Sequence, residues 1–249
     1  MGEDRELEES LAAVKAAHFD AGGTACDYTA LRVSAERSRL DACLTGLESF
    51  DLKRVRIAAQ NAFWVNVFNA VVLRDASELA LAGSVREVEG FFERARLKIG
   101  GLAYSLDDIE HGLLRGNVPK FGRLRSPMKQ DDPRLAYMPL AFDERIHFAL
   151  YSAARSSPAM RVFSAGSLDV QFGQATAEYL RRTVRIEQEG AVVVLPRQFY
   201  WYSKDFGGES GALDFALARL DDEVVDPVDR RRGNVKLHYD KFDWSLNRR

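Results

Sequence analysis

The segment Asn61-Ala-Phe-Trp-Val-Asn-Val-Phe-Asn-Ala-Val-Val-Leu73 decides the fold, because it is the most apolar part of the chain. On a helical wheel, its apolar side chains surround the axis on nearly every side. A helix without a polar face is stable only in the interior of a protein. The sequence therefore predicts a central helix over residues 55–74, with the other elements packed around it.

Two asparagines interrupt this apolar segment. Asn66 and Asn69 are three residues apart, so they lie on the same face of the helix. Each buried amide needs hydrogen-bond partners, because an unsatisfied buried polar group costs about 1–3 kcal/mol. Two interpretations stay open: the amides tie down neighbouring backbone, or they line a pocket and orient a substrate.

Shorter patterns on both sides of the central helix predict the remaining elements. Apolar residues at helical spacing predict helices over residues 1–19, 29–47, 105–115, 167–182 and 211–224. Alternating patterns predict a strand over residues 146–151 and two hairpins, which turn at Gly100-Gly101 and near Glu189-Gly190. Because helices and strands do not alternate regularly, we expect an α+β fold. It would be one helix-rich domain over residues 1–249 around a small, mostly antiparallel sheet.

Composition and charge exclude several classes of function. The chain has 249 residues, with 35 Lys+Arg against 37 Asp+Glu, and its net charge is −2. This balance gives no electrostatic reason to expect a nucleic-acid partner or an anionic membrane. No apolar run approaches the roughly 20 residues of a membrane-spanning helix, and the acidic start lacks the apolar core of a signal peptide. We therefore expect a cytoplasmic protein.

The remaining composition predicts no metal and no cofactor. The two cysteines, Cys26 and Cys43, and the four scattered histidines do not form a zinc-binding pattern. A basic loop over residues 119–134 and a basic tail leave a protein partner open. The aromatic residues of the tail indicate that it docks against the domain.

The predicted helix over residues 105–115 carries the first candidate site residues. Ser105 and Asp108 form a capping box at its start. Glu110 falls inside the apolar arc of this helix, and His111 lies on its border with Arg115 one turn further on. A desolvated Glu110 is either half of a buried ion pair or a general acid/base with a raised pKa.

The predicted strand over residues 146–151 carries the second group. In a strand, Arg145, His147 and Tyr151 share one face. The strand leads into the small-residue turn 152–158, which can present hydroxyl groups. His147 is therefore either a structural residue or a catalytic one.

The segment over residues 197–208 concentrates aromatic side chains, which is typical of a core. Within it, we expect Lys204 and Asp205 to pair with each other at the surface.

Several segments along residues 25–247 carry a shared pattern. They are Asp27-Tyr-Thr-Ala-Leu31, Ala62-Phe-Trp-Val-Asn-Val-Phe-Asn-Ala70, Ile99-Gly-Gly-Leu-Ala-Tyr-Ser-Leu-Asp-Asp-Ile-Glu-His-Gly-Leu-Leu-Arg-Gly116, Asp143-Glu-Arg-Ile-His-Phe-Ala-Leu150, Phe199-Tyr-Trp-Tyr202, Asp205-Phe-Gly207 and Asp243-Trp-Ser-Leu-Asn247. Together, and in this order, they resemble the family called domain of unknown function 547. Residues 1–24 then form an N-terminal helix and turn before the family-like region. The family has no settled activity.

The chain departs from the family at two positions. After the His-bearing segment, the family pattern reads Asn-Cys-Gly-Ala-x-Ser-Cys-Pro, whereas this chain has Ser152 and Ser157 in place of both cysteines. The family's His, Glu, Asn and Cys suggest thiol chemistry in a papain- or transglutaminase-like fold. Because a serine needs a better-placed base than a thiol, the change favours either lost catalysis or a reaction that does not use the thiols.

Three hypotheses follow. In the first, an enzyme hydrolyses or transfers the acyl group of a small polar or anionic metabolite. Its acid–base residues are Glu110 and His147 with His111, its weak candidate nucleophiles are Ser152 or Ser157, and its substrate contacts are Asn66, Asn69, Tyr151 and either Arg115 or Arg145. In the second, a degenerate thiol enzyme binds a ligand or serves as a scaffold without turnover. In the third, the basic loop and tail bind another protein.

Overall fold

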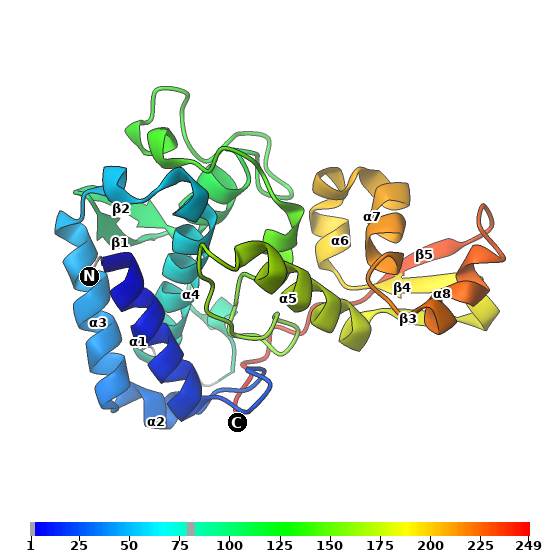
Figure 1. Ribbon diagram of the computed structural model, residues 1–249, viewed down its shortest axis with the longest axis horizontal. Coiled ribbons are helices and arrows are strands. Elements are labelled where there is room, and N and C mark those ends of the chain that lie inside the picture. Colours follow the sequence, from blue (N-terminus) through cyan, green and yellow to red (C-terminus); the bar gives the residue numbers. More distant parts are fainter. Residues whose placement is uncertain (1–2, 79–82) are drawn as a thin grey trace.

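A computed structural model describes residues 3–78 and 83–249 and places a buried helix at the centre of the N-terminal half (Figure 1). This helix, α4 (Gln60–Glu78), buries almost every side chain over its length. Helices α1 (Glu3–His18), α2 (Tyr28–Arg32) and α3 (Ala35–Gly46) pack against it. The predicted central helix is confirmed, although a 3-10 turn over Ile57–Ala59 precedes it.

The two other predicted N-terminal helices are present with changed bounds. The described part of the predicted helix 1–19 is α1, and residues 1–2 lie outside the described residues. The predicted helix 29–47 is divided into α2 and α3, because the Ser34 hydroxyl accepts a hydrogen bond from the Arg37 N–H (3.0 Å) and starts a new helix there.

Within the described residues, the strands form two small sheets instead of one. Strands β1 (Ala95–Ile99) and β2 (Leu102–Ser105) are antiparallel and turn at Gly100-Gly101, where φ is 56° and 77°. Strands β3 (Arg185–Glu187) and β4 (Val192–Leu195) form the second predicted hairpin. Strand β5 (Lys236–Tyr239) adds to β4 in parallel, so the tail docks through the sheet. The α+β fold is confirmed, with two of the three strand pairings antiparallel.

The C-terminal half has a second hydrophobic cluster around Phe148, Phe199 and Leu180. It is built from α5 (Leu168–Thr183), α6 (Gln198–Trp201), α7 (Gly208–Leu217), α8 (Asp222–Asp229) and the three-stranded sheet (Figure 1). The predicted helix 167–182 is confirmed as α5. The predicted helix 211–224 is wrong in its bounds, since α7 ends at Leu217 and the acidic stretch that follows is itself a helix.

The predicted strand over residues 146–151 is wrong. Residues Glu144–Phe148 form a 3-10 helix, and the chain then continues without regular structure. The Asp143 carboxylate starts this helix by accepting a hydrogen bond from the Arg145 N–H (3.0 Å). Since a 3-10 helix has three residues per turn, Arg145 and His147, two residues apart, do not share a face, and Tyr151 lies beyond the helix.

Several short helical segments connect these elements. The 3-10 helices are Leu47–Ser49, Leu52–Arg54, Val85–Glu87, Pro133–Tyr137, Gln188–Gly190 and Ser203–Phe206, and one π-helix spans Asp108–Leu114. The segments Glu144–Phe148, Ser203–Phe206 and Asp108–Leu114 position the candidate site.

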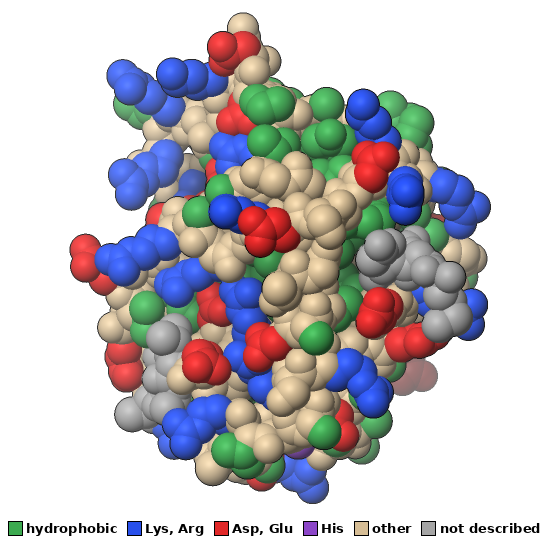
Figure 2. Space-filling model, turned by 90° about the vertical axis from the view of Figure 1, so that its left-hand side faces the viewer, with side chains coloured by type: hydrophobic (Ala, Val, Ile, Leu, Met, Phe, Trp, Pro, Cys, Tyr) green, Lys and Arg blue, Asp and Glu red, His purple; other side chains and the backbone are tan. Residues whose placement is uncertain are grey.

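The surface carries both signs of charge. Figure 2 shows acidic and basic side chains interspersed over one face of the molecule, which accords with the small net charge of the sequence. Within the described parts of the chain, no helix combines the length and apolar character needed to span a membrane.

Candidate active site

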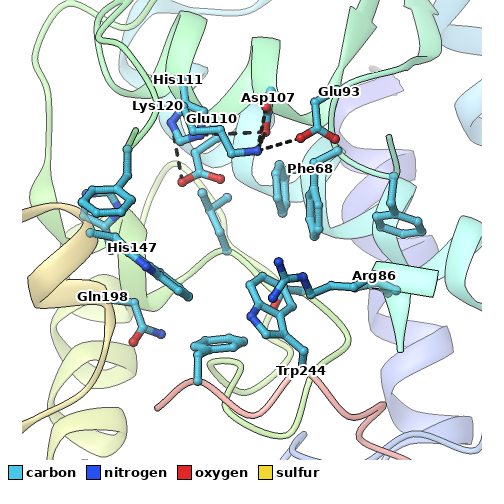
Figure 3. Close-up of a pocket in the computed structure, with 18 of the residues that line it drawn as sticks. Phe68, Arg86, Glu93, Asp107, Glu110, His111, Lys120, His147, Gln198 and Trp244 are labelled. Carbon is cyan, nitrogen blue, oxygen red and sulfur yellow. Dashed lines mark hydrogen bonds and ion pairs between the residues drawn. The ribbon is translucent and has the colours of Figure 1, made fainter. Parts of the chain in front are cut away.

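A cavity of about 390 Å³ lies between the Asp108–Leu114 π-helix, the segment around His147 and the docked tail. Figure 3 shows Glu110 and His111 on one side, His147 and Gln198 on a second, and Arg86 with Trp244 opposite them. Aromatic side chains form much of the remaining wall. This volume and mixture of apolar wall and few polar groups are typical of a small-molecule site.

The π-helix presents Glu110 and His111 to the cavity. The predicted capping box is present, because the Ser105 N–H donates to Asp108 (2.9 Å) and the Asp108 N–H donates to the Ser105 hydroxyl (3.0 Å). The helix ends at Leu114, close to its predicted end, and Gly116 (φ 70°) follows it. Helical segments with this wider turn are rare and frequently lie at functional sites.

Asp205 is the residue that joins the two sides of the site. Its carboxylate accepts two hydrogen bonds from Arg115, at 2.6 and 2.9 Å, and one from His147 Nε2, at 2.8 Å. Burial acts to raise the pKa of Asp205, but the hydrogen bonds from His147 and Arg115 together outweigh it and lower this pKa to about 2. Asp205 is therefore ionised, and its predicted surface pairing with Lys204 is wrong.

The ionised Asp205 fixes the tautomer of His147. Because a carboxylate only accepts hydrogen bonds, His147 Nε2 carries the proton and Nδ1 carries a lone pair. Burial lowers the pKa of His147 despite the neighbouring Asp205, so the ring is neutral near pH 7. Nδ1 has no hydrogen-bond partner among residues 3–78 and 83–249. It is thus the ring nitrogen whose lone pair is not used by the protein.

Tyr202 connects His147 with Glu110. Its ring stacks on His147 with 3.8 Å between centroids, and its hydroxyl donates to Glu110 Oε1 at 2.6 Å. Burial acts to raise the pKa of Glu110, but the hydrogen bond from the Tyr202 hydroxyl and the nearby charge of Arg115 favour the carboxylate, and this pKa is lowered overall. The predicted raised pKa of Glu110 is wrong, and Glu110 is a carboxylate near pH 7.

His111 is held as a neutral ring. Arg115 can only donate, so the contact of its Nη1 with His111 Nδ1 (3.0 Å) makes Nδ1 the acceptor and Nε2 the N–H. Burial also lowers the pKa of His111. Its Nε2 lies 3.8 Å from Asp107, which pairs with Lys120 at 2.9 Å. His111 therefore contributes shape and hydrogen bonding to the wall, without charge.

The structure does not bring Asn66 and Asn69 to the cavity. Asn66 exchanges two hydrogen bonds with the backbone of Phe163 (2.6 and 3.0 Å). Asn69 donates to the carbonyl oxygen of Ala149 (3.1 Å) and accepts from the Tyr151 N–H (2.8 Å). Of the two open interpretations, the structure shows the first: both amides anchor the chain that follows His147 to the central helix.

Other predicted residues also lie outside the cavity wall. Arg145 pairs with Asp143 and Asp169, at 2.7 and 2.9 Å, and Arg115 supports Asp205 from behind. Tyr151 is buried, and its hydroxyl donates to Asn247 (2.8 Å). These three side chains are not placed to hold a substrate anion.

The two serines at the family cysteine positions differ. Ser157 is buried, and its hydroxyl accepts from the Ser152 N–H (2.9 Å) and donates to the Pro158 carbonyl oxygen (3.0 Å). Ser152 lines the cavity, and its hydroxyl has no partner within the described ranges. Of this pair, only Ser152 borders the cavity, and its hydroxyl oxygen is buried.

Sequence reasoning misses Asp205, Tyr202 and Gln198 as site residues. A signal for the first two is present, because the segments 199–202 and 205–207 belong to the family resemblance, yet their aromatic content indicates a core. The acidic and histidine side chains do not form a metal centre: within the part of the chain described, no three of the potential ligands converge.

Comparison with known proteins gives one match. The family described as Protein of unknown function, DUF547 matches residues 52–180, a segment that includes Glu110, His147 and Ser152 but ends before Asp205. No curated protein and no solved structure matches the chain. Because the matched segment is more than half of the 249 residues, the protein belongs to the family of unknown function DUF547.

Proposed function

We propose that the cavity is the active site of a cytoplasmic enzyme that hydrolyses, or transfers the acyl group of, a small polar metabolite. One observation carries this proposal. His147 is neutral, is oriented through Nε2 by the ionised Asp205, and keeps Nδ1 without a partner among the described residues. A histidine oriented by a carboxylate in this way is the arrangement that general-base catalysis requires.

The proton transfers follow from this tautomer. His147 Nδ1 takes the proton of an attacking hydroxyl while that oxygen bonds to the acyl carbon. The carbonyl electron pair moves onto its oxygen, then re-forms the double bond and expels the leaving group, which takes the proton back from His147. The attacking hydroxyl belongs to Ser152 or to water. If it belongs to Ser152, the first product is an acyl-serine, and a water molecule, or the acceptor in a transfer reaction, repeats both steps to release the acyl group and regenerate the hydroxyl. Asp205 stabilises the imidazolium formed between the steps.

Glu110 has a different part in this proposal from the one expected of a general acid. Its lowered pKa keeps it as a carboxylate, so it binds and orients the substrate. Tyr202 is a positioning residue, since it stacks on His147 and donates to Glu110.

A second candidate is a binding protein without turnover. It is favoured by one observation: Ser152 stands at a family cysteine position and has no base hydrogen-bonded to its hydroxyl in the described residues. Restoring the thiol with Ser152→Cys separates the two candidates. If the site once used a thiol activated by His147, the introduced thiol should react with iodoacetamide faster than the buried Cys26 and Cys43.

The direct test is turnover of a panel of p-nitrophenyl esters and p-nitroanilides. We expect His147→Gln to lower kcat/KM roughly 10²–10⁴-fold and His238→Gln, on the exposed face of β5, to change nothing. Ser152→Ala distinguishes the two attacking hydroxyls, because it abolishes turnover only in the serine route. Turnover that is unchanged in His147→Gln would reject the proposal.

A further inference from the structure

The Glu110 carboxylate lacks a cationic partner. Its side chain is only 12% exposed, and within the described residues no lysine or arginine lies within ion-pair distance of it. Its near neighbours are the Tyr202 hydroxyl and the neutral ring of His111, 3.8 Å away. Burying a carboxylate is costly unless a cation or several hydrogen bonds compensate for it. The site therefore has an unbalanced negative charge where a ligand would bind.

The neighbouring cations are already engaged elsewhere. Arg115 gives a bidentate pair to Asp205. Lys120 lies between Asp107 and Glu93, at 2.9 and 3.1 Å, and Figure 3 shows both interactions. Neither cation is left to hold an anionic ligand at this end of the cavity. The expected binding of an anionic substrate by Arg115 or Arg145 is therefore not favoured.

The polar groups beside Glu110 are mainly acceptors. His147 Nδ1 carries a lone pair, as its tautomer requires. Gln198 Nε2 donates to the Tyr179 hydroxyl (2.8 Å), whose proton goes to the Ser156 carbonyl oxygen (2.9 Å). This order fixes the amide, so Gln198 Oε1 is an acceptor, and no described residue donates to it. A ligand group that meets these atoms has to donate hydrogen bonds.

The opposite wall suits an apolar or aromatic body. Trp201, Phe242 and Trp244 pack against one another with centroid distances of 4.5 to 6.0 Å and line the same cavity. Aromatic faces also attract organic cations. Arg86 lies on the same wall, with its guanidinium over the Trp244 ring (5.3 Å to the centroid), so a cationic group is favoured at the Glu110 end of the cavity and not at this one.

We propose that the cavity binds a small organic cation, an amine or amidine on an aromatic or apolar body, with its charged group against Glu110. This inference rests on the proposed function for the identification of the cavity as the substrate site. It goes beyond that function by naming the chemical class of the substrate.

The test is calorimetric titration of the wild-type protein with three probes of one size: benzylamine, benzyl alcohol and benzoate. We expect benzylamine to bind at least tenfold more tightly than benzyl alcohol, which is a difference of about 1.4 kcal/mol in binding free energy. Benzoate should bind most weakly. Equal or tighter binding of benzoate, or no preference for benzylamine, would overturn the inference. This comparison needs no variant and no turnover.

Two variants locate the contact. Glu110→Gln should remove the preference for benzylamine while benzyl alcohol binding stays, and Glu89→Gln, at an exposed carboxylate of the rim, should leave both unchanged. Benzylamine binding that persists in Glu110→Gln would also overturn the inference. His147→Gln separates the two proposals, because it should abolish turnover but keep the amine preference.

Discussion

At the residue scale, Asp205 is the side chain on which the geometry of the site depends. It connects Arg115 on the π-helix with His147 on a separate 3-10 helix, and only 8% of its side chain is exposed. Removing one member of a buried ionic network leaves the others uncompensated, which commonly costs about 3–5 kcal/mol.

We predict that Asp205→Asn lowers the free energy of unfolding by about 3 kcal/mol. The control is Asp214→Asn, at a surface ion pair with Arg232, which should cost less than about 0.5 kcal/mol. Denaturant unfolding measures both. The folded pKa of Asp205 lies below its unfolded value, so its contribution is present above about pH 4 and is lost as the pH falls toward 2. A loss in Asp205→Asn that is the same at pH 2.5 and pH 7 would contradict this assignment.

The pH dependence of the rate tests the state of His147. Burial lowers its pKa below the ordinary value of about 6.5, so the free-base form persists to lower pH than usual. We predict that kcat/KM on any hydrolysed substrate stays level from pH 8 to pH 6.5 and falls only below that. In stability, this histidine contributes fully above about pH 6.5 and loses its contribution as the pH falls. A rate that already falls below pH 7.5 would show a raised pKa instead.

The sequence identifies Glu110, His111, His147 and Ser152, which all line one cavity. Their residue types and the family resemblance are sufficient for that. The sequence does not identify Asp205 as a site residue, because the hydrogen bond between Arg115 and Asp205 joins residues 90 positions apart and leaves no local pattern. Of the two interpretations of Glu110, the raised pKa is wrong, since the charge state depends on the Tyr202 hydrogen bond and on Arg115, and not on burial alone.

At the scale of elements, close packing of α7 on the 3-10 helix Ser203–Phe206 positions Asp205. Gly211 in α7 lies so near the Phe206 carbonyl group that a methyl group there would overlap it. Gly173, in α5, has open space around it, and no described atom of a neighbouring element lies within 4 Å of the place that an added methyl group would take.

These two glycines make a matched pair. We predict that Gly211→Ala lowers the melting temperature and displaces the segment that carries Asp205, so activity falls with stability. Gly173→Ala should stabilise the protein by about 0.5–1 kcal/mol, because alanine is the better helix former. Thermal unfolding and turnover of both variants measure this. Equal effects of the two substitutions would disprove the packing argument.

Periodicity predicts the long elements well, because α4 and α5 have strong apolar patterns. It fails for residues 146–151, where alternation of polar and apolar side chains resembles a strand. Two interactions decide that conformation. The Asp143 cap acts locally, and the hydrogen bond from the Tyr151 N–H to Asn69 comes from the distant helix α4. The π-helix is also not predictable, since its capping and apolar residues are those of an ordinary helix.

At the scale of the whole molecule, the cavity joins two hydrophobic clusters. Phe68 belongs to the N-terminal cluster, Tyr202 packs against the C-terminal one, and both line the cavity. We propose that residues 1–249 fold as one domain for this reason. The docked tail completes the cavity, because Phe242 and Trp244 form part of the cavity wall.

The tail is anchored by Asn247. Its side-chain oxygen accepts from the hydroxyls of Tyr28 (2.7 Å) and Tyr151 (2.8 Å), and its amide donates to the Thr24 carbonyl oxygen (2.7 Å). We predict that Asn247→Ala destabilises the protein by about 1–3 kcal/mol, because the two hydroxyls can then bond only to each other, which leaves one of them without an acceptor. The exposed Asn234→Ala should have little effect. Denaturant unfolding measures the difference, and a neutral Asn247→Ala would show that the tail is not held here.

The central claim is that His147 and Glu110 form a working small-molecule site, and thermal unfolding against a metabolite library tests it most directly. A ligand at a hundred times its Kd adds about 2.7 kcal/mol, which raises Tm by several degrees in a protein of this size. We predict an amine-bearing compound that shifts the wild-type protein, fails to shift Glu110→Gln, and is turned over by the wild-type protein but not by His147→Gln. A library that shifts neither wild type nor variants, or a shift that both substitutions leave unchanged, would contradict the account.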